Sequence, residues 1–157
     1  MVFTVLLLCF LIGCVAGLRS MMAPAIICAA AYLRWIHLDG TPLSWMNTMG
    51  ALSIFTLFAI GELVADKLPQ TPARTAPVGL IARAVTGALS GAALSVSGGK
   101  GLAIGALLGA AGGVAGAFAG YHIRRGLVVQ TKLPDFVVAV MEDLLAISGG
   151  LFICSRM

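Results

Sequence analysis

Glu142 and Asp143 are adjacent carboxylates in the middle of an apolar stretch near the end of the chain. Short acidic side chains cannot reach the edge of a membrane from such a position, and a charge there costs about 3 kcal/mol. Two neighbouring carboxylates in a dry environment therefore need a positive partner or a proton. Their types and position predict either a buried ion pair or a site that binds a proton or a cation.

Three more charged side chains lie inside apolar stretches: Arg19, Glu62 and Arg83. A guanidinium group is a planar fork of donors that matches a carboxylate or a phosphate. We expect Arg19 to form a buried ion pair with Glu142 or Asp143, to meet Glu62, or to bind an anionic ligand group. We expect Arg83 to reach Glu142 or Asp143, or to extend to the edge of the membrane.

Asp66 follows Glu62 by four residues, so the two would share one face of a helix. Asp66 and Lys67 also suit a helix end at the membrane surface, since the long side chain of Lys67 extends to water. With Asp66 included, the candidate cluster holds two arginines and four acids. This excess of acids favours a bound cation or proton, because carboxylates without arginine partners must find another positive charge.

The elements around these residues are those of a membrane protein. Of the 157 residues, 60% are hydrophobic and 10% are charged, whereas about 25% of an average soluble domain is charged. A soluble protein of this size could not cover so much apolar surface. These numbers exclude a soluble enzyme, a nucleic-acid-binding protein and a disordered chain. We expect a single all-α transmembrane domain over residues 1–157.

Six apolar stretches predict a bundle of about six membrane spans, since a span needs about 20 apolar residues. Gly17, Arg19 and Ser20 separate the first two stretches, and Pro24 follows closely. This segment, Arg19–Pro24, is either a turn at the membrane surface or a re-entrant break inside the membrane, where free backbone groups must be buried in protein. The six stretches are residues 2–17, 21–36, 46–64, 78–97, 101–122 and 135–153.

The two halves of the chain resemble each other in the order of their polar residues. An arginine, a tyrosine followed by an arginine, and a glutamate occur in spans one to three and again in spans four to six. Three spans per half would make a 3+3 inverted repeat, which is a common plan of transporters. Chance is the alternative explanation, because the spacings differ.

Span five carries glycines at four-residue spacing, which is just over one helical turn and aligns them in a groove. Such a groove lets another helix approach closely. It is expected to hold either another span or a second copy of the protein, which would make a homo-oligomer. Helix packing is predicted at Gly101, Gly105, Gly109 and Gly113, at Gly112, Gly116 and Gly120 on the adjoining face, and at Gly87 and Gly91 of span four.

The basic residues predict the orientation in the membrane. With six full spans, Arg34, Lys100 and Arg156 fall on the side of the N-terminus, and the other side carries Arg19, Lys67, Arg74, Arg124, Arg125 and Lys132. Because Lys and Arg are enriched in cytoplasmic loops, both termini are expected outside the cytoplasm, in an inner (plasma) membrane. A basic exterior also suits anionic headgroups, so membrane lipid is an expected partner.

Three ordered segments resemble a bacterial family of small membrane proteins, domain of unknown function 4126. They are Gly17-Leu18-Arg19 followed by Pro24, the stretch 62–69 leading to residues 87–89, and the stretch 137–146 with its two acids. The resemblance covers about residues 15–150 and implies a compact multi-span bundle without an established activity. Two departures stand out: Met21 and Met22 replace an aromatic residue, and residues 70–77 lack the family's acidic and histidine residues.

The interpretation that these residues favour is a small membrane transporter or channel. Its cluster of acids and arginines would bind a proton or a small cation. The alternatives are a structural or partner-binding protein whose charges are fixed ion pairs, and a lipid-handling protein whose arginines meet phosphate headgroups. The sequence contains no catalytic motif, metal-ligand spacing or cofactor signature, so we expect neither an enzyme nor a cofactor.

Overall fold

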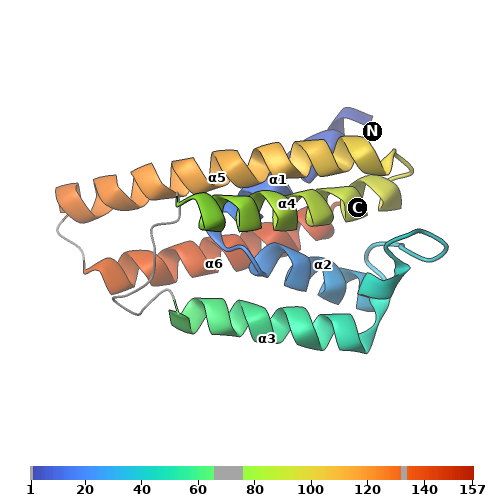
Figure 1. The fold of residues 1–157 in the computed structure, drawn as a ribbon, viewed down its shortest axis with the longest axis horizontal. Coiled ribbons are helices and arrows are strands. Elements are labelled where there is room, and N and C mark those ends of the chain that lie inside the picture. Colours follow the sequence, from blue (N-terminus) through green and yellow to red (C-terminus); the bar gives the residue numbers. More distant parts are fainter. Residues whose placement is uncertain (1, 66–75, 132–133) are drawn as a thin grey trace.

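The computed structural model describes residues 2–65, 76–131 and 134–157, and these form a helical bundle (Figure 1). Each of the six apolar stretches forms a helix, and the expected all-α fold class is confirmed. The largest difference is in α5, which continues well beyond residue 122. The elements are α1 (Val2–Leu18), α2 (Met22–Tyr32), the short 3-10 helix η1 (Ser44–Asn47), α3 (Met49–Ala65), α4 (Pro77–Ser97), α5 (Leu102–Thr131) and α6 (Asp135–Cys154).

Length and apolar surface indicate a membrane protein. Among the described residues, α4, α5 and α6 contain segments long and apolar enough to cross a membrane, whereas α1, α2 and α3 are shorter apolar helices. The 11 residues of α2 extend about 16 Å at about 1.5 Å per residue, roughly half of a hydrocarbon layer. Large apolar side chains such as Leu57, Leu107 and Leu144 are exposed on α3, α5 and α6.

The first two helices form a re-entrant hairpin. The N-terminus, residues 33–48, residues 98–101 and the C-terminus lie at one end of the bundle, which we call the terminal end (Figure 1). Helix α1 runs from this end into the bundle and α2 runs back towards it. The turn between them is buried, since Arg19 is 0% exposed and Ser20 is 6% exposed. The turn therefore lies inside the bundle, as the prediction of a re-entrant break requires.

The α4–α5 hairpin differs from this first hairpin. It turns at the terminal end, where Gly99 has a φ of +68°, a left-handed conformation that glycine adopts without steric cost. The two hairpins thus reach different depths of the bundle and have helices of different length. An inverted repeat of the two halves stays a prediction.

Helices α1, α4 and α5 pack at backbone distance, and we call them the glycine-packed group. A Cβ atom added at Gly109 would collide with the backbone of Gly87 and Gly91 in α4, and one added at Gly112 would collide with α1 near Cys14. Helix α5 thus presents one glycine face to α4 and another to α1. Close approach of this kind gives membrane helices their packing contact.

The other glycines extend this pattern unevenly. Gly105 and Gly113 face α4, and Gly116 faces α1, whereas a Cβ at Gly101 would have no atom within 4 Å. Gly120 is buried. Because helices of the same chain fill both faces of α5, this groove requires no second copy of the protein, and a homo-oligomer stays a prediction.

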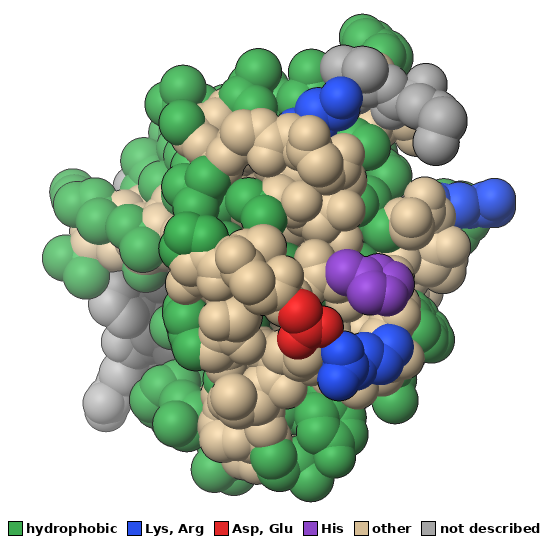
Figure 2. Space-filling model, turned by 90° about the vertical axis from the view of Figure 1, so that its right-hand side faces the viewer, with side chains coloured by type: hydrophobic (Ala, Val, Ile, Leu, Met, Phe, Trp, Pro, Cys, Tyr) green, Lys and Arg blue, Asp and Glu red, His purple; other side chains and the backbone are tan. Residues whose placement is uncertain are grey.

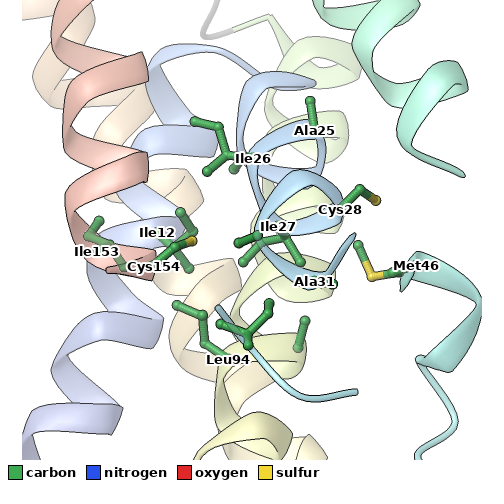
Figure 3. Packing of buried hydrophobic residues seen from close by; sticks show 14 of the residues in the cluster. Ile12, Ala25, Ile26, Ile27, Cys28, Ala31, Met46, Leu94, Ile153 and Cys154 are labelled. Carbon is green, nitrogen blue, oxygen red and sulfur yellow. The ribbon is translucent and has the colours of Figure 1, made fainter. Parts of the chain in front are cut away.

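Helices α2, α3 and α6 pack through side chains, and we call them the α2–α3–α6 group. Nine of the 11 residues of α2 are buried, and Ile27 lies at the centre of the apolar core (Figure 3). Around it lie Ile12 of α1, Leu94 of α4, Ile153 of α6 and Met46 of η1. The short helix α2 therefore connects the two groups and holds the re-entrant turn in place.

Candidate functional site

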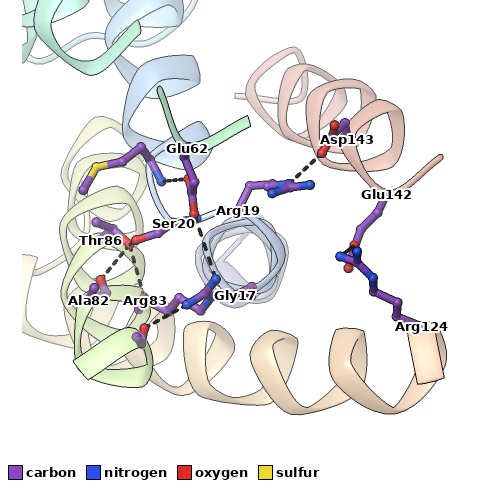
Figure 4. Close-up of polar contacts among 12 residues, drawn as sticks. Gly17, Arg19, Ser20, Glu62, Ala82, Arg83, Thr86, Arg124, Glu142 and Asp143 are labelled. Atoms are coloured by element: carbon purple, nitrogen blue, oxygen red, sulfur yellow. Dashed lines mark hydrogen bonds and ion pairs between the residues drawn. The ribbon is translucent and has the colours of Figure 1, made fainter. Parts of the chain in front are cut away.

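Three arginine–carboxylate contacts surround the re-entrant turn (Figure 4). We call these six residues the polar cluster. The closest contacts described for the pairs are Arg19 Nε to Asp143 Oδ1 at 2.6 Å, Arg124 Nη1 to Glu142 Oε2 at 3.8 Å and Arg83 Nη2 to Glu62 Oε1 at 4.0 Å.

In all three pairs the arginine lies on one side of the bundle and the carboxylate on the other. The arginines come from the turn after α1, from α4 and from α5, on the side of the glycine-packed group. The carboxylates come from α3 and α6, in the α2–α3–α6 group. The polar cluster therefore lies between the two groups of helices and links them by opposite charges.

Glu62 caps the start of the returning helix. One of its carboxylate oxygens accepts the backbone N–H of Ser20 at 2.8 Å, and the other accepts the N–H of Met21 at 2.8 Å. The first N–H groups of a helix have no partner within the helix, and they carry a partial positive charge. A carboxylate from the last turn of α3 satisfies two of these groups.

Arg83 stabilises the other side of the break. Its Nε donates to the carbonyl of Gly17 at 3.1 Å, near the end of α1, and its Nη1 donates to the carbonyl of Gly79 at 3.1 Å. The hydroxyls of Ser20 and Thr86 lie 3.3 Å apart. Charged and polar side chains of α3 and α4 thus replace the backbone hydrogen bonds that the break in the helix removes.

The pairing of Arg19 is one of those expected from the sequence, since Arg19 contacts Asp143 at 2.6 Å. The carboxylate of Glu62 binds the backbone beside Arg19. The described contacts of Arg83 are with α1, α4 and Glu62, so the expected approach to Glu142 or Asp143 is not among them. The turn between α1 and α2 explains this arrangement, because it points the Arg19 side chain at α6 while the N–H groups of Ser20 and Met21 face α3 (Figure 4). Asp66 lies outside the described residues.

Arg124 is the member of the cluster that sequence reasoning missed. It was expected in a loop, but α5 continues to Thr131, and the Arg124 side chain is 20% exposed beside Glu142. One sequence signal could have predicted the longer helix: no helix-breaking proline lies between residues 102 and 133. The described cluster holds three arginines and three carboxylates, so the expected excess of acids is not found in the described part of the chain.

The arrangement limits the chemistry of the cluster. Within the described ranges, no group of three or more His, Cys, Asp or Glu side chains could hold a metal ion. Each carboxylate of the cluster has a guanidinium group within 4.0 Å. Such pairs can hold a fixed structure, or they can open when a proton neutralises the carboxylate.

Fold and site together indicate a small helical membrane protein with a buried turn between its first two helices and ion pairs between its two groups of helices. The family model described as "Domain of unknown function (DUF4126)" matches residues 6–155, and the chain belongs to this family. Neither the curated proteins nor the solved structures compared with the chain give a match. The family resemblance of the sequence is confirmed, and the function has to be argued from the site itself.

Proposed function

We propose that this protein is a small membrane transporter in which a proton or a small cation passes through the polar cluster. The observation that carries the proposal is the buried break between α1 and α2, with ionisable side chains on both sides. Transporters build their sites at discontinuous helices near the middle of the bilayer. Ionisable side chains at that depth are costly and mark ion or proton pathways by default.

The balance of charges favours a proton over a metal cation. Metal cations such as Ca²⁺ and Mg²⁺ need about six or more oxygen ligands, whereas every described carboxylate of the cluster already has an arginine within 4.0 Å. A proton needs only one acceptor. Glu142 and Asp143 are the proposed acceptors, because Glu62 is occupied by the backbone of the turn.

The distribution of basic residues predicts how the proposed transporter is oriented in the membrane. We place the terminal end outside the cytoplasm and Arg125, which is exposed near the other end of α5, on the cytoplasmic side. Arg124 and Glu142 then lie between the re-entrant turn and the cytoplasm. A proton that leaves Asp143 would meet Glu142 next on α6.

Proton flux in proteoliposomes tests the proposal. Glu142→Gln and Asp143→Asn remove one titratable group each but keep the shape of the side chain and an oxygen that accepts from arginine. With a pH dye inside the vesicles, we expect flux driven by a pH gradient to fall to the background of empty vesicles in both variants. Asp39→Asn is the matched control, since Asp39 is an exposed acid at the terminal end. Unchanged flux in both cluster variants would overturn the proposal.

The second candidate is a structural membrane protein, favoured by the capping of the turn by Glu62 and Arg83. An exchange of charges separates the two candidates. The double variant Arg124→Glu/Glu142→Arg keeps an ion pair but reverses its direction. A transporter is expected to fold and to lose flux in this variant, whereas a structural protein is expected to keep its phenotype in cells. Lipid handling by the cluster has less support, because its arginines already face carboxylates.

A further inference from the structure

A pocket at the terminal end lies apart from the polar cluster. Its volume is about 330 Å³, and three distant segments of the chain form it: the first turns of α1, the α4–α5 turn and the residues that follow α6. Lys100 and Arg156 line it together with the hydroxyl-bearing Thr4. The pocket therefore depends on the folded bundle and belongs to no single helix.

The charge of this pocket is positive. The residues described as lining it include Lys100 and Arg156 but neither Asp nor Glu. The Arg156 guanidinium lies 4.6 Å above the ring of Phe152, one turn earlier, which orients it on the outer face of α6. Lys100 is half-buried, and its backbone N–H donates to the Ser95 carbonyl at 2.8 Å. Two cations from different segments thus line one pocket, where both can contribute to the binding of an anion.

The other charges of this end do not neutralise the pocket. Arg34 and Asp39 form an exposed ion pair with each other at 2.6 Å. Figure 2, which looks onto this end, shows basic side chains at separate places along its edge with hydrophobic side chains beside them. An anion that approaches from the membrane surface therefore meets Lys100 and Arg156, with no acidic side chain among the residues described as lining the pocket.

Apolar surface beside the pocket indicates what kind of anion it takes. Val5 and the buried Leu8 form apolar walls. On the same helix Phe3 is 80% exposed, and Phe152 of α6 is 57% exposed. Exposed side chains of this size face lipid in a membrane protein. A phosphate in the pocket would thus have a hydrocarbon surface directly next to it.

We propose that this pocket binds the phosphate of an anionic phospholipid, with the acyl chains along the exposed apolar faces of α1 and α6. Basic pockets between membrane helices are known to hold lipid headgroups in this way. The proposal is independent of transport, because it uses none of the residues of the polar cluster. A bound lipid would join the N-terminal helix, the α4–α5 turn and the C-terminus at one point.

Native mass spectrometry of the full chain in detergent tests this site. Dioleoyl phosphatidylglycerol and dioleoyl phosphatidylcholine are titrated separately, and the wild type is expected to prefer phosphatidylglycerol. In Lys100→Gln/Arg156→Gln the affinity for phosphatidylglycerol should fall about 25-fold, since each cation near an anionic headgroup contributes about fivefold. The matched control Arg34→Gln/Arg125→Gln removes the same number of charges outside the pocket and should change the affinity less than about twofold.

Two further measurements, a pocket-filling variant and a competition with inorganic phosphate, identify the ligand. Thr4→Trp fills the pocket without a change in charge, and because Thr4 is exposed the bundle is expected to fold; retention of phosphatidylglycerol should fall. Inorganic phosphate added at millimolar concentration should not displace the lipid. Equal loss in both double variants, full retention in Thr4→Trp, or displacement by inorganic phosphate would each overturn the proposal.

Discussion

The glycine-packed group and the α2–α3–α6 group are held together by different kinds of contact. In the first group, α5 meets α1 and α4 at backbone distance, with glycines where side chains would stand. In the second group, α2 is surrounded by the side chains of its neighbours. Between the groups lie three ion pairs and the capped turn.

This difference separates helices that meet through backbone contacts from helices that meet through side chains. Where glycine lies against backbone, no side chain can rotate to change the distance between α5 and its neighbours. The ion pairs between the groups join side chains that can rotate. The interface between the groups is therefore where a change in charge can become a change in structure.

The largest expected effect is the loss of the glycine-packed group in Gly109→Leu. A Cβ at this position would collide with the backbone of α4, and a leucine adds three more carbon atoms to it. Overpacking costs up to about 3 kcal/mol or more when the surroundings cannot shift, and three helices meet here. We expect no monodisperse protein in size-exclusion chromatography.

Gly61→Leu is the control for this prediction, because a Cβ at Gly61 of α3 has no atom within 4 Å. It should elute like the wild type. A well-folded Gly109→Leu protein would show that α5 is not fixed by backbone contact.

The buried ion pair gives the next largest effect. Asp143→Ala leaves the 0% exposed Arg19 without its carboxylate, and loss of one partner of a buried pair costs about 3–5 kcal/mol. Unfolding titrations in mixed micelles measure this difference. The double variant Arg19→Met/Asp143→Leu should regain most of the stability, since it removes both charges. No recovery in the double variant would mean that the pair specifies the interface by more than its charge.

A smaller effect is expected for Glu62→Ala, which removes the acceptor of two backbone N–H groups. A buried donor without a partner costs about 1–3 kcal/mol. Hydrogen exchange should show faster exchange at Ser20 and Met21 than at the rest of α2. Glu62→Gln keeps one carbonyl oxygen as acceptor and should fall between the wild type and the alanine variant. Unchanged exchange at both amides would contradict the capping role.

The smallest effect is expected for Arg34→Ala. Arg34 and Asp39 are as close as Arg19 and Asp143, at 2.6 Å, but their side chains are 65% and 60% exposed. Exposed ion pairs contribute about 0–1 kcal/mol to the free energy of unfolding, so the midpoint temperature of unfolding should hardly change. A loss as large as that of Asp143→Ala would show that distance, and not burial, sets the value of an ion pair here.

The sequence was sufficient to locate the helices and the buried polar residues. Apolar length defined all six helices, and Arg19, Arg83, Glu142 and Asp143 stood out because charges are rare in such stretches. The described structure buries all four. Gly17 and Pro24 also indicated a break, although composition could not decide its depth.

The sequence left several acids open as the partner of each arginine, for a physical reason. Which acid an arginine meets depends on the rotation of each helix and on the direction of a turn, and neither leaves a signal in spacing. Arg19 reaches α6 only because the chain reverses inside the bundle. Arg124 lies in the cluster because α5 continues beyond its apolar part, where composition alone predicts a loop.

The re-entrant hairpin also has a consequence for the order in which the chain assembles during synthesis. Helix α1 leaves the ribosome first, yet its glycine partner is α5 and the partner of Arg19 is on α6. Neither exists until most of the chain has been made. The hairpin therefore cannot take up its packed position before α5 and α6 have been synthesised.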